Sequence, residues 1–160
     1  MNLAELRSQI ALGEDSRRHF KRDVTNADSL AAEMAAFANS EGGTIYLGVG
    51  DDGSLPGLIR TDVARLNQLI GNAASQHVRS PLTVHTENVA IGDEHVVISQ
   101  NTSQKIVGLI RGNPEITIAA LAASARVSDR TIKNHLEKLR AQGHVRRIGP
   151  DKGGHWEVTE

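Results

Sequence analysis

Cysteine is absent from the 160 residues of the sequence. Disulfide bonds, thiolate metal sites and cysteine nucleophiles are therefore excluded, which suits a reducing compartment. Aromatic residues are also scarce, at 2%, although hydrophobic residues make up 39% of the chain. A core can form, but Ala, Leu, Ile and Val must supply most of it.

Long apolar segments are missing as well. No run approaches the roughly 18 residues that suggest a membrane-spanning helix, and residues 1–25 lack an apolar stretch behind a basic start. We therefore expect no membrane association and no signal peptide, and a protein that works in the cytoplasm. The length suits one ordinary domain or two small ones.

A large excess of one charge is absent from the whole chain but not from its parts. The formal net charge is −1. Residues 103–160 contain ten Lys and Arg against six Asp and Glu, a net +4, whereas residues 1–102 contain eight against thirteen, a net −5. A basic segment on a nearly neutral chain is typical of a module that binds a polyanion.

A polar stretch from Ser99 to Ser103 is the best candidate for a domain boundary, dividing the chain into residues 1–101 and 102–160. Hydrophobic periodicity and turn residues before it predict a small α+β domain. The expected elements are a helix that Asp28 caps and that ends at 39–43, a strand over 44–49, a helix over 61–75, and paired strands over 82–91 and 95–98.

The pattern after the boundary is sharper. It predicts a helix around 106–110, a helix capped by Thr117, a turn at 125–127, a helix that begins after Ser128 and ends at Gly143, and strands over 145–148 and 155–158. This order is typical of a winged helix-turn-helix, in which the second helix of the helix-turn-helix enters the major groove of DNA.

The helix after Ser128 has an apolar face formed by Ile132, Leu136 and Leu139, which leaves its polar residues exposed. Arg can pair with guanine and Asn with adenine, whereas Lys can neutralise phosphates. The alternative for any one of them is an ordinary solvated helix face. The candidate DNA-binding residues of this segment are Ser128, Arg130, Thr131, Lys133, Asn134 and Lys138.

The predicted hairpin adds Arg146, Arg147 and Lys152 around a glycine-rich tip. Contacts of such a wing with phosphates give affinity and register rather than sequence choice. We expect Trp156 to pack the wing against the first helix of the segment. The three histidines of the segment are expected on the polar surface: His135, His144 and His155.

The run 146–156 resembles the winged-helix tail of bacterial and archaeal RecG-related transcriptional regulators, and the likeness covers residues 102–158. Residues 37–49, with 51–53 and 56–58, resemble the Schlafen/AlbA-type DNA-binding domain. That likeness runs from about Gly13 to Leu58 and fades through Ile98. A histidine-kinase-like ATPase region commonly separates the two domains in such regulators. It is absent here, so the resemblance implies neither ATP nor another cofactor.

Some Schlafen proteins are ribonucleases in which three carboxylates hold a divalent cation that activates water. The resemblance places the first carboxylate at Glu14 and the third at Asp51 or Asp52, but His19 occupies the second position. Neutral histidine replaces an anionic oxygen poorly for magnesium, although it can bind manganese or zinc. We therefore expect no enzymatic activity and no metal. A metal-dependent endoribonuclease acting on structured RNA is the alternative.

Arg17, Arg18, Lys21 and Arg22 form a basic cluster in the otherwise acidic N-terminal part. They could make a second contact with nucleic acid, or they could be a solvated charge run. The same domain could instead bind protein or form a homodimer, which would suit a two-fold DNA site. The sequence thus predicts an α+β protein, with a Schlafen/AlbA-like domain and a winged helix, that binds specific double-stranded DNA and regulates transcription.

Overall fold

The computed structural model describes residues 1–150 and 153–159. It combines helices and strands, as expected of an α+β protein. The chain divides into an N-terminal unit, residues 1–101, and a C-terminal unit, residues 102–160. The longest helix of the described chain has 17 residues and carries Arg60, Asp62 and Arg65. No described helix is both long and apolar enough to cross a bilayer.

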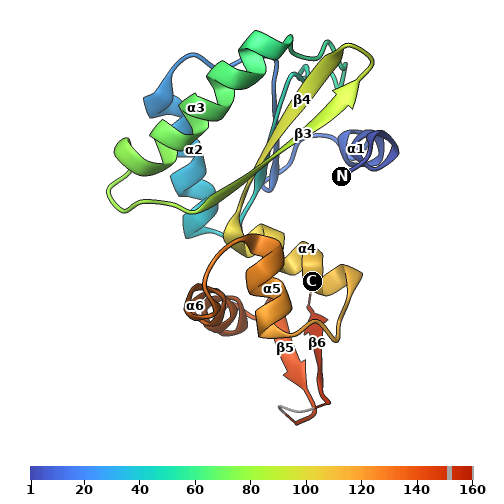
Figure 1. Ribbon diagram of the computed structural model, residues 1–160, viewed down its shortest axis with the longest axis vertical. Helices are drawn as coiled ribbons and strands as arrows, with labels where there is room; N and C mark the ends of the chain where they lie inside the picture. The colour runs from blue at the N-terminus through green and yellow to red at the C-terminus, as the bar shows by residue number, and fades with distance from the viewer. Residues whose placement is uncertain (151–152, 160) are drawn as a thin grey trace. The chain divides into compact units, whose positions relative to one another are not determined.

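A four-stranded sheet organises the N-terminal unit (Figure 1). The strand order is β1-β2-β4-β3, with β1 parallel to β2 and the other neighbours antiparallel. The helix between the two parallel strands supplies the crossover that such a pair needs. The elements are α1 (Leu3–Ile10), β1 (Arg18–Lys21), α2 (Ala27–Asn39), β2 (Thr44–Leu47), α3 (Arg60–Gln76), β3 (Val84–Ile91) and β4 (Glu94–Asn101).

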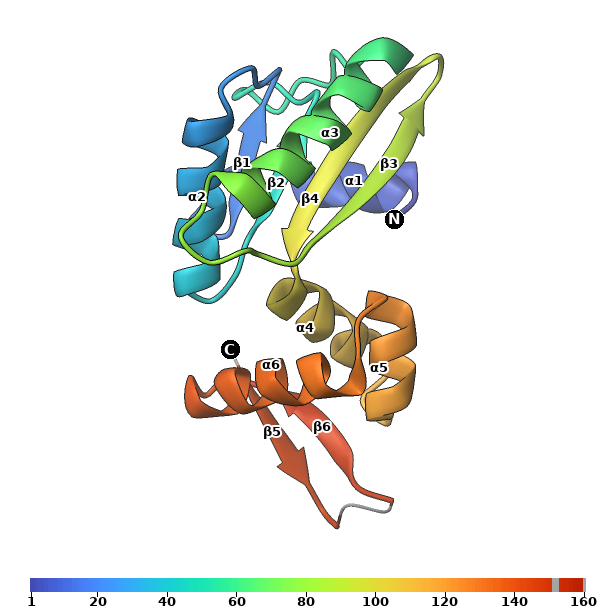
Figure 2. The same ribbon diagram turned by 60° about the vertical axis from the view of Figure 1, so that its left-hand side comes forward.

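Both faces of this sheet are covered, because side chains alternate along its strands. Ile45, Leu47 and Val97 pack in one cluster with the apolar residues of α2 and α3. Tyr46 and Ile98 pack in a second cluster with α1. Figure 2 shows α2 and α3 on one side of the sheet and α1 on the other.

Two elements of the N-terminal unit, α1 and β1, were not predicted. Asn2 caps α1 through a capping box with Glu5, a signal present in the sequence. The cap of α2 was predicted wrongly, because the side chain of Asn26 accepts a hydrogen bond from the Ser29 N–H. Asp28 instead lies with its Oδ1 2.7 Å from His77 Nδ1.

The junction between α2 and β2 depends on two glycines for different reasons. Gly42 has a φ of +93°, the left-handed conformation that ends many helices. A Cβ atom on Gly43 would lie 2.4 Å from the ring of Phe37, so only glycine lets the strand begin beneath that ring. The strand then ends at Leu47, two residues earlier than predicted, because Gly48 has a φ of +91°.

The C-terminal unit contains α4 (Thr102–Gly112), α5 (Ile118–Ala125), α6 (Asp129–Ala141), β5 (Val145–Ile148) and β6 (His155–Val158). Thr117 and Ser128 cap α5 and α6, as predicted. The boundary predicted between Ser99 and Ser103 agrees with the division of the chain into the two units, and it falls where β4 ends at Asn101 and α4 begins at Thr102. Thr102 is buried at the start of α4.

One apolar cluster joins all five elements of the C-terminal unit. Ile106, Leu121 and Ile132, one from each helix, are fully buried in it. Trp156 belongs to the same cluster, and its backbone N–H donates to the Pro114 carbonyl at 2.8 Å. The hairpin is thereby tied to the segment between α4 and α5, and the predicted core position of Trp156 is confirmed.

Candidate nucleic-acid interface

The helix α6 has two chemically distinct faces. Ile132, Leu136 and Leu139 are buried in the core of the C-terminal unit. With 3.6 residues per turn, Arg130 and Asn134 lie on the opposite side of the helix, and both are exposed. A guanidinium and a carboxamide one turn apart form the kind of surface that can reach base edges.

Further polar side chains flank this pair. Lys133 and Lys138 are exposed, on opposite flanks of the face that Arg130 and Asn134 occupy. Glu137 is exposed on the same face and was not predicted as a contact. A carboxylate there can accept a hydrogen bond from the exocyclic amine of cytosine. The sequence could have indicated this residue, because Glu137 follows Lys133 by four residues and residues four apart are neighbours on a helix surface.

The first turn of α6 uses its hydroxyls internally. Ser128 Oγ accepts a hydrogen bond from the Thr131 N–H at 3.2 Å and lies 2.9 Å from Thr131 Oγ1. Ser128 is exposed whereas Thr131 is half-buried. Both residues stand at the start of the helix, but their hydroxyls are engaged in the cap in the absence of a ligand.

The hairpin holds its two arginines in different ways. Arg146 faces Glu157 across the strands and forms an ion pair with it. The hydrogen bond that Arg146 Nε donates to Glu157 Oε2 raises the pKa of Arg146 and lowers the pKa of Glu157. Arg147 lies opposite Trp156, with its guanidinium carbon 5.1 Å from the ring centroid. The third predicted wing residue, Lys152, lies outside the described residues.

His135 was expected on the polar surface, but it is half-buried. Its Nδ1 lies 3.0 Å from Ser103 Oγ, so this side chain joins α6 to α4. Burial lowers the pKa of His135, and the nearby charge of Lys138 lowers it further. His135 therefore helps to hold α6 against α4 and is not part of the exposed face of α6.

The basic cluster of the N-terminal unit is largely neutralised by nearby carboxylates. Arg17 pairs with Glu41, and Arg18 pairs with Asp15. Lys21 Nζ lies 3.4 Å from Glu33 Oε2. These contacts leave less net positive charge for a polyanion than the sequence alone indicates.

Arg22, the fourth member of the cluster, belongs to a loop that follows β1. The side chain of Arg22 lies close to Gly50, because a Cβ atom built on Gly50 would be 3.3 Å from Arg22 Nε. Asp52 belongs to another loop, the one that follows β2. Hydrogen bonds from the hydroxyl and N–H of Ser54 lower the pKa of Asp52, and the charge of Arg22 contributes to the same shift.

Of the positions expected for a nuclease metal site, Glu14, His19 and Asp52 are engaged elsewhere, and Asp51 is exposed. Glu14 Oε1 accepts a hydrogen bond from the Phe20 N–H at 2.6 Å, which fixes the start of β1. Asp52 Oδ1 accepts from the Ser54 N–H at 3.0 Å, which closes a turn. His19 is hydrogen-bonded to Glu33. In residues 1–150 and 153–159, no three His, Cys, Asp or Glu side chains converge as metal ligands, so the residues present do not fit a three-carboxylate cation site.

Comparison with known proteins adds a family assignment. A family model described as "Schlafen, AlbA_2" matches residues 14–137. The match extends beyond Leu58 and Ile98, the limits expected from the sequence, and reaches Glu137 in α6. No curated protein matches the chain.

Proposed function

Because the chain belongs to the Schlafen, AlbA_2 family, we propose that it binds nucleic acid and that its C-terminal unit is a winged helix-turn-helix for double-stranded DNA. The observation that carries the proposal is the exposed face of α6, where Arg130 and Asn134 lie opposite buried Ile132. A helix about 10–12 Å wide fits the major groove of B-form DNA, which is about 12 Å wide.

The elements around α6 support the same proposal. The chain passes from α5 to α6 through Arg126, whose φ of +52° ends α5 in the left-handed conformation. The short connection makes α5 and α6 neighbours, and the β5–β6 hairpin follows α6 directly. This is the order of elements in a helix-turn-helix with a wing. For that reason, a relationship to RecG-related regulators remains part of the proposal.

The proposed activity is binding without catalysis. The carboxylates that a Schlafen-type nuclease would use serve as hydrogen-bond acceptors for Phe20 and Ser54. We assign the N-terminal unit to homodimerisation, because its cations are mostly paired and a two-fold regulator needs a second copy. In this scheme α6 supplies sequence choice, and the protein regulates transcription from two-fold DNA sites.

Salt-dependent binding to a labelled duplex tests the proposal. Each phosphate that the protein neutralises adds about −0.9 to the slope of log affinity against log salt. We expect a steep slope for DNA and much weaker binding to an RNA duplex of the same sequence, since side chains cannot read the narrow major groove of A-form RNA. A flat salt response, or equal affinity for both duplexes, would contradict it.

A genome-wide binding profile of the tagged protein then tests regulation, and light scattering tests the dimer. Enrichment at promoters with a two-fold sequence motif is the expected result. Uniform coverage would leave a DNA-binding protein without a regulatory role. A monomeric mass at the concentration used for DNA binding would contradict the assignment of the N-terminal unit to homodimerisation.

A further inference from the structure

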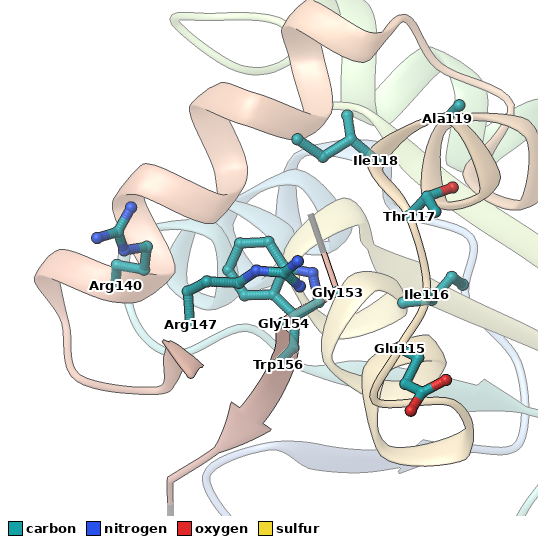
Figure 3. Close-up of a pocket in the computed structure, with 10 residues that line it drawn as sticks. All are labelled: Glu115, Ile116, Thr117, Ile118, Ala119, Arg140, Arg147, Gly153, Gly154 and Trp156. Atoms are coloured by element: carbon teal, nitrogen blue, oxygen red, sulfur yellow. The ribbon is translucent and has the colours of Figure 1, made fainter. Parts of the chain in front are cut away.

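The two units differ in how far their surface groups are engaged by the chain itself. In the C-terminal unit, a groove beside α5 is lined by Arg140 and Arg147, and the Arg147 guanidinium is stacked on the Trp156 ring (Figure 3). In the N-terminal unit, backbone groups along the outer edge of β3 have no such partner in the described chain. We infer that this edge pairs with the same edge of a second copy, which joins two four-stranded sheets across a two-fold axis. The inference rests on the proposed homodimer and names its contact surface.

The direction of the backbone groups of β3 follows from the turn that joins it to β4. Residues 92–93 form a two-residue turn, and Ile91 pairs with Glu94 across it. Residues that flank such a turn exchange two hydrogen bonds, and every second pair along the antiparallel ladder does the same. The residues between the bonded pairs direct their N–H and C=O groups away from β4: Thr86, Asn88 and Ala90.

These outward N–H and C=O groups of Thr86, Asn88 and Ala90 form what we call the β3 edge. The strand β3 is the last in the sheet, and Figure 2 shows it at the right-hand margin. Within residues 1–150 and 153–159, no hydrogen bond outside the β3–β4 ladder reaches the backbone of these three residues, and all three are exposed. A row of unpaired backbone groups is a template on which another strand can pair.

The opposite edge of the same sheet has the features that prevent such pairing. The strand β1 has four residues, and Arg18, His19 and Lys21 are three of them. The strand β3 has eight residues, and its sequence VHTENVAI contains no Pro, Gly, Lys or Arg. Short edges and edges with basic side chains resist strand addition, whereas a longer edge without them permits it. The contrast between the two edges favours β3 as the contact.

A second copy of the chain fits this edge in geometry and in charge. Two copies of β3 can pair antiparallel about a two-fold axis through Asn88, which places Thr86 of each copy opposite Ala90 of the other. All of these residues then direct their backbone groups toward the other strand and exchange hydrogen bonds. In this register Glu87 lies opposite Val89. An axis through Glu87 would instead place two carboxylates directly opposite each other, which destabilises a strand pair.

Paired charges test both the contact and its register. Thr86→Lys with Ala90→Lys places lysine opposite lysine at two positions of the dimer, whereas Thr86→Lys with Ala90→Glu places lysine opposite glutamate at both. Sedimentation velocity of the full-length protein over a concentration series measures the Kd of the dimer. We expect the first double variant to raise this Kd about tenfold or more, because like charges directly opposite repel. The second should stay within about threefold of the native Kd or lower it.

The matched control adds the same two positive charges elsewhere in the N-terminal unit. Ala32 and Ala36 are exposed in α2, which lies beside β1 at the other margin of the sheet in Figure 2. Ala32→Lys with Ala36→Lys should leave the Kd of the dimer within about threefold of the native value. Circular dichroism verifies that all three variants fold. An equal weakening in the control, or the same Kd in both edge variants, would overturn the inference.

Amide hydrogen exchange gives a readout specific to strand pairing. The N–H groups of Asn88 and Ala90 face outward, so we expect them to exchange slowly only at concentrations at which the dimer forms. The N–H groups of Glu87 and Val89 bond to β4 and should be protected at every concentration. Outward N–H groups that exchange equally fast in monomer and dimer would overturn the β3 contact.

DNA binding separates the failure of this inference from the failure of the proposed function. The lysine double variant should bind a duplex with a single half-site at least as well as the native chain, because α6 belongs to the other unit, and should lose affinity for a two-fold site. A native chain that is monomeric at every concentration overturns both the β3 contact and the homodimer. A dimer that persists in the lysine variant overturns only the β3 contact. A dimer that forms through β3 but binds no duplex keeps this inference and refutes the proposed DNA binding.

Discussion

The two units have similar numbers of basic residues but hold them differently. Arg17, Arg18 and Lys21 of the N-terminal unit each contact a carboxylate. Arg130 and Lys133 of α6 are exposed, beside Glu137. A run of basic letters in a sequence is therefore a poor guide to a polyanion surface, because the surrounding elements decide which charges are neutralised.

The difference has a structural origin. The strand β1 lies at the edge of the sheet, and α2 brings Glu33 next to both His19 and Lys21. The basic face of α6 points away from the core that buries Ile132 and Leu136. When one face of a helix is buried, the polar side chains of the other face are open to solvent and to a ligand. The charged side chains of a strand that lies beside a helix can instead pair with acidic residues of that helix.

Removing positive charge from each unit in turn should produce the largest contrast. Arg130, Lys133 and Lys138 are changed together to Gln in one variant, and Arg17, Arg18 and Lys21 in the other. We expect the α6 variant to lose about a thousandfold in duplex affinity, about 4 kcal/mol, since each charged hydrogen bond contributes about 1.5–3 kcal/mol. The N-terminal variant should change it by less than about threefold.

Fluorescence anisotropy with one duplex at fixed salt compares the two variants. Thermal unfolding is measured beside it, because the N-terminal variant loses three partly exposed ion pairs, each worth about 1 kcal/mol or less. Equal losses of affinity in both variants would abolish the contrast between the units and assign DNA contact to β1 as well.

The β5–β6 hairpin can be destabilised by a substitution that changes no charge. A Cβ atom on Gly154 would lie 2.4 Å from the Pro150 carbonyl oxygen and 2.5 Å from that of Ile148. Backbone atoms cannot move aside cheaply, so Gly154→Ala should destabilise the C-terminal unit by about 3 kcal/mol. Gly108→Ala in α4 is the control, since no atom outside the adjoining helix backbone lies within 4 Å of its Cβ position.

Denaturant unfolding measures both glycine variants. The control should be neutral or slightly stabilising, because alanine favours a helix over glycine by about 1 kcal/mol. A Gly154→Ala protein as stable as the native chain would show that the hairpin tolerates a different backbone path.

The division of labour within α6 gives the next effect in size. Arg130→Ala or Asn134→Ala should change the preferred sequence, with a loss of about 1–3 kcal/mol in discrimination at one base pair. Lys133→Ala should weaken all sequences alike and reduce the salt slope by about one. Selection from a random duplex library checks this, and an unchanged motif in Asn134→Ala would remove that residue from base reading.

The left-handed residue between α5 and α6 should give a smaller, opposite effect. Arg126 has a φ of +52°, a conformation that costs a non-glycine residue about 1–2 kcal/mol. Arg126→Gly should therefore stabilise the C-terminal unit by about 1 kcal/mol, after the greater flexibility of glycine in the unfolded chain is allowed for. Thermal unfolding measures it, and a lower midpoint would mean that the arginine side chain stabilises this turn.

The smallest effect concerns pH. Burial holds the pKa of His135 below its ordinary value of about 6.5. The unfolded chain then binds a proton more strongly than the folded one, so stability is full above about pH 6.5 and falls as the pH drops below it. His135→Gln should flatten this dependence. An unchanged slope between pH 7.5 and 5.5 in that variant would assign the effect to other groups.

Local chemistry predicted the C-terminal unit well. The caps at Thr117 and Ser128, the buried positions of α6 and both strands of the hairpin were visible as residue types at fixed spacing. The same approach missed α1, in which only Leu6 and Ile10 are buried, and β1, in which only Phe20 is buried among charged residues. Neither pattern shows a hydrophobic period to the eye, and tertiary packing of these few apolar side chains stabilises both elements.

The sequence by itself determined which residues are cationic, which face of α6 is apolar, and that Thr117 and Ser128 cap α5 and α6, because these features depend on neighbours along the chain. Only the tertiary structure decided that Glu33 meets Lys21, that His135 is held against Ser103, and that Arg140 and Arg147 line one groove. Each of these contacts joins residues from different elements. Their distances follow from the packing of helices on strands, which no spacing along the sequence specifies.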